Sequence, residues 1–184
     1  ERVQLATLLG EFEVFLEQSL YGAPLDAILA METEAELADY AEGAGGDFRF
    51  FLRLADDLAL SRLGKGPGRL LSYGAYHTAD GPLLPAGVAT AVGDVLPLNV
   101  GGISEDVAHA WFLEAGDHPW DAVTMPSAAK EQAYSWAKAP RLDGLPADTG
   151  ATARLAVAEH PLIAALIARD GGTSVRTRIV ARLV

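Results

Sequence analysis

The sequence predicts an α+β fold, mainly helical, with a small antiparallel sheet and a long irregular central segment. In the first and last thirds, apolar residues recur at three- and four-residue steps, as in amphipathic helices. The middle third holds short apolar runs bounded by glycine and proline, which is typical of strands joined by turns. We expect a single domain over residues 1–184, because half of the residues are hydrophobic, enough to form one core. The chain opens on Glu1 rather than methionine, so we expect a domain excised from a longer chain.

Two helices are predicted at the start of the chain. Leucine and phenylalanine recur at helical spacing over residues 5–20, which is typical of an amphipathic helix, and Gly22 is placed to end that helix. Thr33 followed by Glu36 is the pattern of a capping box, in which each side chain bonds the other residue's backbone N–H. This pattern predicts a short helix that ends near Gly43.

A further long helix is predicted to begin at Asp47, since aspartate is a favoured N-cap. Gly64 is expected to end it. The residues expected to face inward are Phe48, Phe51, Leu52, Ala55, Leu58, Ala59 and Leu63.

The middle of the chain predicts two strands and a turn. Residues 69–76 are expected to form one strand, residues 80–82 a turn, and residues 88–92 a second extended stretch. Pro85 confines the second strand to a sheet edge or interrupts it, because proline cannot donate a ladder hydrogen bond. Residues 93–133 are rich in glycine and proline without a sustained period, which predicts mostly irregular chain.

The last third predicts three helices. Asp148 or Thr149 is expected to cap the first, and Pro161 occupies a first-turn position of the second, which ends at Gly171. Thr173 is expected to cap the last helix.

Charge and cysteine content exclude several classes of function. Twenty-five acidic against fourteen basic residues give a net charge of −11, so we expect no nucleic-acid partner and no anionic membrane partner. The chain has no cysteine, which excludes disulfides, thiolate metal sites and a thiol nucleophile within it. No apolar run approaches the length of a membrane span, and we expect a cytoplasmic protein.

The sequence contains no complete motif of a common catalytic or metal-binding site. The glycine-rich run at 64–68 lacks the serine or threonine of a phosphate loop and leads from helix to strand, so it is interpreted as a turn. If residues 104–109 formed a helical turn, Glu105 and His109 would share one face and supply two metal ligands. No serine lies in a nucleophile motif. We therefore expect no catalytic residue and no metal site.

The segment 134–141 combines unusual residue types within eight positions. It contains a tryptophan, Lys138, Pro140 and Arg141. A proline that fixes the backbone next to an arginine could direct a cation at a buried anion. The alternative interpretation is a surface loop with a core tryptophan.

Six segments together resemble, in order, motifs of the large subunit of nickel–iron hydrogenases. They are residues 71–76 (LSYGAY), 84–88 (LPAGV), 105–112 (EDVAHAWF), 118–124 (HPWDAVT), 134–141 (YSWAKAPR) and 149–154 (TGATAR).

The resemblance implies a pocket for an iron unit. Family members hold their metal pair with cysteine thiolates that lie outside the matching span, and the arginine of their K-A-P-R motif contacts a cyanide ligand of the iron. By resemblance, Arg141 would make this contact, with Pro140 and Lys138 in the pocket wall and His109 nearby. From the resemblance we expect that the chain holds no cofactor of its own. We expect that it contacts an Fe(CN)2CO unit transiently.

Within that family, the chain most resembles the HupK-type accessory proteins, shortened relatives associated with assembly of the iron cofactor. We therefore expect a non-catalytic accessory or scaffold protein of hydrogenase maturation. The expected partners are maturation chaperones, iron-delivery proteins and a hydrogenase subunit. Two alternatives remain: the interior of a catalytic large subunit that oxidises hydrogen, and a structural interaction module without a cofactor pocket.

Overall fold

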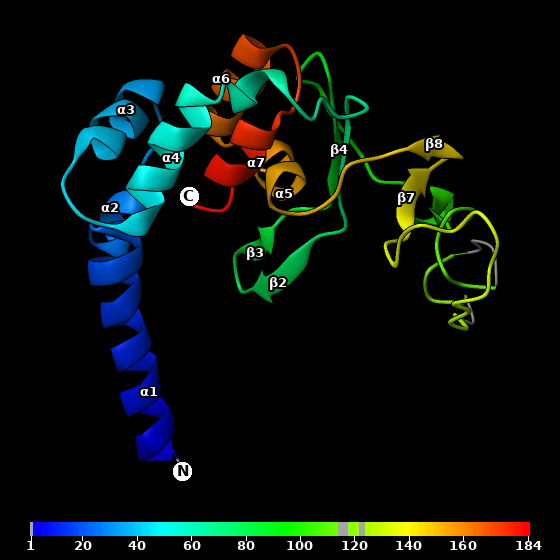
Figure 1. The fold of residues 1–184 in the computed structure, drawn as a ribbon, viewed down its shortest axis with the longest axis horizontal. Coiled ribbons are helices and arrows are strands. Elements are labelled where there is room, and N and C mark those ends of the chain that lie inside the picture. The colour runs from blue at the N-terminus through cyan, green and yellow to red at the C-terminus, as the bar shows by residue number, and fades with distance from the viewer. Residues whose placement is uncertain (1, 114–117, 122–123) are drawn as a thin grey trace. The chain divides into compact units, whose positions relative to one another are not determined.

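The computed structural model describes residues 2–113, 118–121 and 124–184. They form two compact units, one of residues 1–65 with 159–184 and the other of residues 66–158. Figure 1 labels their helices and strands. In the described residues the first unit is helical, and the second contains the strands. Helices and small antiparallel sheets together confirm the α+β class.

The first unit begins and ends with helices. Its elements are α1 (Arg2–Phe15), the π-helix η1 (Leu16–Tyr21), α2 (Leu25–Leu29), α3 (Glu34–Glu42), α4 (Asp47–Asp57), the 3-10 helix η2 (Leu60–Arg62), α6 (Pro161–Asp170) and α7 (Val175–Val180). The capping box of α3 is confirmed, because the Thr33 hydroxyl accepts from the Glu36 N–H and the Glu36 carboxylate accepts from the Thr33 N–H. Pro161 begins α6 and Gly171 ends it in the left-handed conformation, as predicted.

Three cap predictions were wrong by one or two residues. Asp47 is the first residue of α4 and Gly46 is its N-cap. Ser174 rather than Thr173 caps α7, with its hydroxyl accepting from the Thr177 N–H. The helix α5 (Ala151–Val157) begins after Gly150 and not at a polar cap.

The helix α4 is shorter than predicted because Ala59 adopts a left-handed backbone conformation, with φ of 52°. Of its predicted inward residues, Leu52 and Ala55 are buried, while Phe51 and Leu58 are exposed. A narrower stripe than expected therefore packs against α3 and α7.

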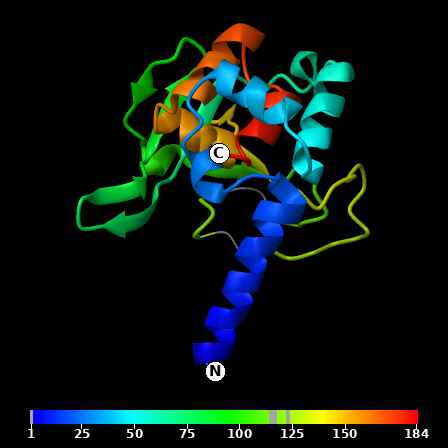
Figure 2. The same ribbon diagram turned by 90° about the vertical axis from the view of Figure 1, so that its left-hand side faces the viewer.

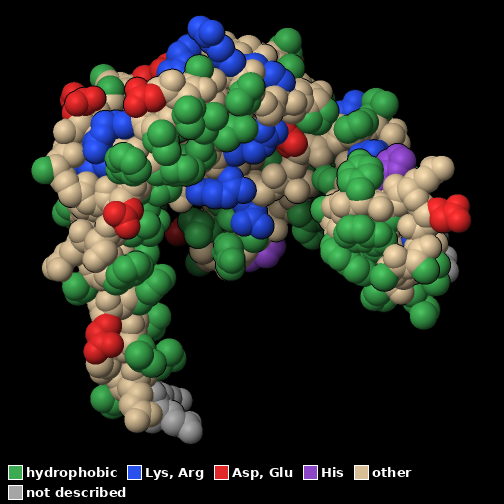
Figure 3. Space-filling view, in the orientation of Figure 1, with side chains coloured by type: hydrophobic (Ala, Val, Ile, Leu, Met, Phe, Trp, Pro, Cys, Tyr) green, Lys and Arg blue, Asp and Glu red, His purple; other side chains and the backbone are tan. Residues whose placement is uncertain are grey.

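The predicted N-terminal helix forms, and Gly22 ends it in the left-handed conformation. Its apolar stripe does not face a core within the described chain. Figure 3 shows hydrophobic side chains along α1. Those of the predicted stripe are between 51% and 61% exposed: Leu5, Leu8, Leu9, Phe12 and Phe15. The amphipathic period shows that this helix has an apolar face and not what covers that face.

A buried cation fastens the end of η1 to the loop before α4. The guanidinium of Arg49 donates to the carbonyl oxygens of Tyr21, Gly22 and Ala44, and lies 4.7 Å from the ring centroid of Tyr40. Arg49 is only 9% exposed. It thus satisfies three backbone acceptors that would otherwise lie beside an apolar core.

Replacing Arg49 with methionine should destabilise the protein by about 3 kcal/mol, because the carbonyl oxygens lose a charged donor and stay shielded from water. Urea unfolding measures the change. Arg62→Met, at an exposed position of η2, is the matched control and should change stability by less than about 0.5 kcal/mol. Equal effects of the two substitutions would contradict the role of Arg49.

The second unit contains three small antiparallel sheets. Its elements are β1 (Arg69–Ser72), β2 (Ala75–Thr78), β3 (Gly81–Leu84), β4 (Gly87–Thr90), β5 (Val95–Leu96), the 3-10 helix η3 (Val100–Gly102), β6 (Ile103–Asp106), β7 (Ala139–Leu142), β8 (Leu145–Pro146) and α5. The sheet orders are β1-β4-β5, β2-β3 and β6-β7-β8. The β2–β3 hairpin projects from the first of these sheets (Figure 2).

The predicted strand over 69–76 is two strands. The chain breaks at Gly74, whose φ of 89° favours glycine and where a Cβ would lie 3.2 Å from Ala86. Pro85 falls between β3 and β4, which confirms the predicted interruption. The helical turn considered for residues 104–109 does not form, since residues 104–106 belong to β6.

A small core joins two of the sheets. Leu71 of β1 and Val88 of β4 pack with Ile103 of β6 and Leu142 of β7. The other face of β1 is covered by α5. This core fixes β6 and β7, the strands that carry the candidate site. Among the described residues, no single helix is long and apolar enough to cross a membrane.

Candidate functional site

The candidate site is built on the pairing of β6 with β7. Ser104 lies opposite Arg141 and Glu105 opposite Pro140 in the antiparallel register. The pairing brings two acidic residues of β6 to Arg141 of β7 and to Lys138, which directly precedes β7. Lys138 forms an ion pair with Glu105, and Arg141 forms one with Asp106. Three of the residues predicted for the pocket, Lys138, Pro140 and Arg141, therefore lie together on or beside β7.

Arg141 is held at both ends of its guanidinium. Its Nη2 donates to Asp106 Oδ2 at 2.6 Å, and its Nη1 donates to the Pro140 carbonyl oxygen at 3.2 Å. The other carboxylate oxygen of Asp106 accepts from the Ala108 N–H at 2.8 Å. The Ala108 N–H, and after it the Arg141 guanidinium, hold the pKa of the Asp106 carboxyl below its ordinary value.

Two cavities meet Arg141. One, of about 350 Å³, is also lined by Glu105, Asp106 and Lys130. The other, of about 190 Å³, is lined by Asp106, His109 and Arg141 with the Tyr134–Ser135 segment. Arg141 and Asp106 thus lie between two hollows, and a small anion in either one would lie within reach of the guanidinium.

Lys130 is a residue of this site that the sequence did not predict. Its ammonium group donates to the carbonyl oxygen of Val107 at 2.7 Å and to that of Phe112 at 2.8 Å. It therefore ties together the two ends of the segment that carries His109. A lone lysine in an irregular stretch carries no sequence signal of this role.

Aromatic side chains support the same segment. The ring of Trp136 packs against those of Trp111 and Phe112, with centroids 5.1 and 5.6 Å apart. The backbone N–H of Trp111 donates to the Ser135 carbonyl oxygen. Trp136 is nevertheless 53% exposed, so the interpretation of this residue as a core tryptophan was wrong. It fixes the loop to β7 from the surface.

His109 is exposed and its ring stacks on Tyr134 with centroids 5.4 Å apart. It lines a cavity with Arg141 but does not share a helix face with Glu105, because their segment is not helical. The condition for a two-ligand metal arrangement of Glu105 and His109 is therefore not met. Among the residues that the structure describes, no group of three or more histidine or acidic side chains is placed to hold a metal ion.

His118 has a structural contact. Its Nδ1 lies 2.7 Å from the Ile103 carbonyl oxygen, and its ring stacks on Trp120. A carbonyl oxygen only accepts, so Nδ1 carries the proton. This bond fastens residues 118–121 to the start of β6. Residues 122–123 of the predicted motif lie outside the described residues.

Lys130→Met should destabilise the protein by about 2 kcal/mol, because two carbonyl oxygens lose a charged donor. Urea unfolding followed by tryptophan fluorescence measures it, since Trp111 and Trp136 lie on the affected segment. Arg154→Met, an exposed position of α5, should leave stability within about 0.5 kcal/mol of the parent. A Lys130 variant as stable as the control would contradict the tie.

The lowered pKa of Asp106 predicts acid sensitivity. A carboxyl whose pKa is lower in the folded state stabilises the fold above its unfolded pKa, and this contribution is lost as pH falls through the folded value. Below about pH 4, the parent should therefore lose more stability than Asp106→Asn does, relative to pH 7. Urea unfolding at both pH values measures the difference. Asp80→Asn, in the exposed β2–β3 turn, is the control, and an Asp106→Asn profile that overlays the parent would refute the prediction.

Comparison with known proteins supports the resemblance. Residues 54–166 match the family model of the nickel-dependent hydrogenases. The chain is 30% identical over 153 residues to the hydrogenase-1 large chain of Escherichia coli, covering 62% of this chain and 26% of that one. It is 35% identical over 122 residues to the uptake hydrogenase large subunit of Azotobacter chroococcum, covering 50% and 20%. The chain thus spans about a quarter or less of these relatives.

Solved structures show the same likeness. The Ni-Fe-Se hydrogenase of Desulfovibrio vulgaris Hildenborough superposes with a TM-score of 0.55 at 25% identity, over 82% of this chain and 38% of that one. The [NiFeSe]-hydrogenase of Dm. baculatum gives 0.53 at 26% identity, over 82% and 37%. Since the family model covers more than half of the residues, this chain belongs to the nickel-dependent hydrogenase large-subunit family.

Proposed function

We propose that this chain is a non-catalytic accessory or scaffold protein of nickel–iron hydrogenase assembly, and that it handles the iron unit as cargo. One observation carries the proposal: Arg141 lies between two cavities, in a hydrogenase-family chain that has no cysteine. The arginine of the K-A-P-R motif is thus present, whereas the thiolates that hold a metal pair in family members lie outside the matching span. HupK-type accessory proteins are the relatives that this combination most resembles.

The residues present do not fit a resident nickel–iron pair. Such a pair is held by thiolates, which the 184 residues alone do not supply and which in family members lie outside the matching span. An iron unit that already carries cyanide and carbon monoxide is different, because cyanide ligands are anionic hydrogen-bond acceptors. The guanidinium of Arg141 offers planar donors to such an anion and stays charged at every physiological pH.

Asp106 is suited to exchange with the cargo. It holds Arg141 in the structure, but its other oxygen accepts from the Ala108 N–H. When an anion replaces Asp106 on Arg141, the carboxylate therefore keeps one backbone donor, and its partly exposed position gives it water as well. The exchange costs one part-exposed ion pair, an interaction of modest strength. Lys138 stays on Glu105 meanwhile, and Lys130 holds the cavity wall.

Infrared spectroscopy tests the proposal. An iron complex with two cyanides and one carbonyl, mixed anaerobically with the protein and then passed through a desalting column, should co-elute with its cyanide and carbonyl bands shifted. Arg141→Leu should weaken retention at least about tenfold, because a charged hydrogen bond is lost. Asp106→Asn should strengthen it, because the competing carboxylate is gone. Arg154→Leu is the control.

Retention that is unchanged in Arg141→Leu, or absent in the parent, would overturn the proposal. The second of these outcomes would favour the structural module without a pocket. Hydrogen oxidation by the purified chain would also overturn it.

A second candidate is a segment of a catalytic large subunit, and the identity to hydrogenase large chains favours it. The two proposals differ in the parent polypeptide. Cys-x-x-Cys pairs upstream of Glu1 and downstream of Val184 would support the catalytic subunit, and their absence the accessory protein. The accessory proposal expects cytoplasmic partners: maturation chaperones, iron-delivery proteins and a hydrogenase subunit.

A further inference from the structure

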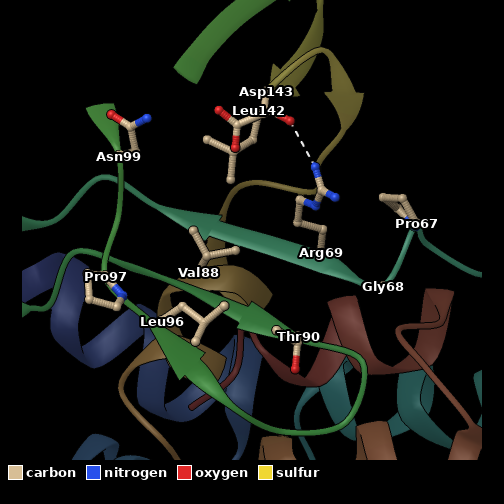
Figure 4. A pocket seen from close by; sticks show the side chains of 10 residues that line it. All are labelled: Pro67, Gly68, Arg69, Val88, Thr90, Leu96, Pro97, Asn99, Leu142 and Asp143. Atoms are coloured by element: carbon tan, nitrogen blue, oxygen red, sulfur yellow. Dashed lines mark hydrogen bonds between the residues drawn. The ribbon is translucent and has the colours of Figure 1, made fainter. Parts of the chain in front are cut away.

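A separate cavity of about 400 Å³ lies on the β1-β4-β5 sheet and shares no lining residue with the cavities at Arg141. Figure 4 shows the side chains around it. They come from β1, β4, β5 and the end of β7, and from the segments before β1, after β5 and after β7, all within the unit of residues 66–158. Its size falls within the range of small-molecule sites. Nothing in the proposed function uses it.

The floor of this cavity is apolar. Val88 lies opposite Leu96 in the β4–β5 register, so the two side chains share one face of the sheet. Leu142 contributes from β7. Val88 and Leu142 are buried in the small core, whereas Leu96 is 51% exposed. The cavity therefore opens onto the edge of that core and can take a hydrocarbon group against it.

Arg69 supplies the positive charge. It lies opposite Thr90 in the β1–β4 register, on the same face of the sheet as Val88. Its Nη1 donates to the Leu142 carbonyl oxygen at 2.8 Å, which fixes the plane of the guanidinium (Figure 4). Its Nε and Nη2 donors have no acceptor among the residues that the structure describes. A part-buried guanidinium with free donors on one edge matches the two oxygens of a carboxylate.

The other polar residues limit the charge of the ligand. The Thr90 hydroxyl accepts from the Asp94 N–H in the β4–β5 turn, so it is engaged. Asp143 also lines the cavity, and its backbone N–H donates to the Gly102 carbonyl oxygen at 2.8 Å. Its carboxylate would repel negative charge on a ligand, so a ligand with one charge, held by Arg69, is favoured over a ligand with two. This arrangement disfavours dicarboxylates and phosphates.

We propose that this cavity binds a short aliphatic monocarboxylate. The carboxylate accepts from the free Nε and Nη2 donors of Arg69. The hydrocarbon chain lies on Val88, Leu96 and Leu142. Binding is non-covalent and independent of the iron cargo, so its test does not depend on the proposed function.

Hexanoate is the probe, and amide chemical shifts in an NMR titration of the 184-residue chain are the readout. The shifts should concentrate on β1, β4 and β5. The neutral hexanamide and the cationic hexylamine should bind at least about tenfold more weakly, because each lacks the charge that Arg69 recognises. Butyrate should bind about tenfold more weakly than hexanoate, because it buries two fewer methylene groups.

Substitutions separate the two halves of the site. Arg69→Met should lower hexanoate affinity at least about tenfold. Since that variant also loses the bond to Leu142, Arg69→Lys provides a milder test and should lower affinity about threefold through loss of the planar fork. Leu96→Ala, at a half-exposed position, should reduce the preference for hexanoate over butyrate and leave butyrate affinity unchanged. Arg154→Met is the control and should bind as the parent does.

Three results would overturn the proposal. Equal affinity for hexylamine and hexanoate would show that the cavity does not recognise a carboxylate. Shifts that spread over the exposed stripe of α1 would show adsorption to apolar surface. Parent-like affinity in both Arg69 variants would show that Arg69 does not bind the ligand.

Discussion

The pairing of β6 with β7 is the constraint on which the candidate site depends. It brings Glu105 and Asp106 of β6 within reach of Lys138 and Arg141, so that the backbone ladder and two ion pairs support the same geometry. The small core beneath it, with Ile103 and Leu142, holds both strands against β1 and β4. Lys130 and the packing of Trp136 then fix the loop that faces Arg141. An irregular segment thus acquires a defined position from a few contacts at its ends.

Local patterns in the sequence predicted local structure well. The capping box at Thr33, the first-turn proline at Pro161 and the interruption at Pro85 each depend on neighbouring residues alone, and each is confirmed. Local patterns placed some helix starts one residue away, since Gly46 and Ser174 are the N-caps where Asp47 and Thr173 were predicted. Features that depend on distant contacts were not predicted: the stripe of α1 is helical but exposed, and Ile103–Asp106 is a strand because β7 pairs with it.

Some residues of the candidate site were predicted from a local motif, whereas their partners depend on distant contacts. Arg141, Pro140 and Lys138 were predicted from a motif, and the structure brings them together on or beside β7. The acidic partners of Lys138 and Arg141 lie on β6, more than thirty residues earlier in the chain. No local pattern in the sequence indicates the strand register that forms these ion pairs. The role of Lys130 was not predictable either, because its partners are backbone carbonyl oxygens, which every residue has.

In the proposed function, Arg141 exchanges Asp106 for an anionic ligand of iron. A crystal structure of the protein grown anaerobically with an iron complex carrying two cyanides and one carbonyl tests this exchange. We expect a cyanide nitrogen on the Arg141 guanidinium, with Asp106 released from Arg141 and still bonded to the Ala108 N–H. An Arg141–Asp106 ion pair left intact, with iron bound elsewhere or not at all, would contradict it.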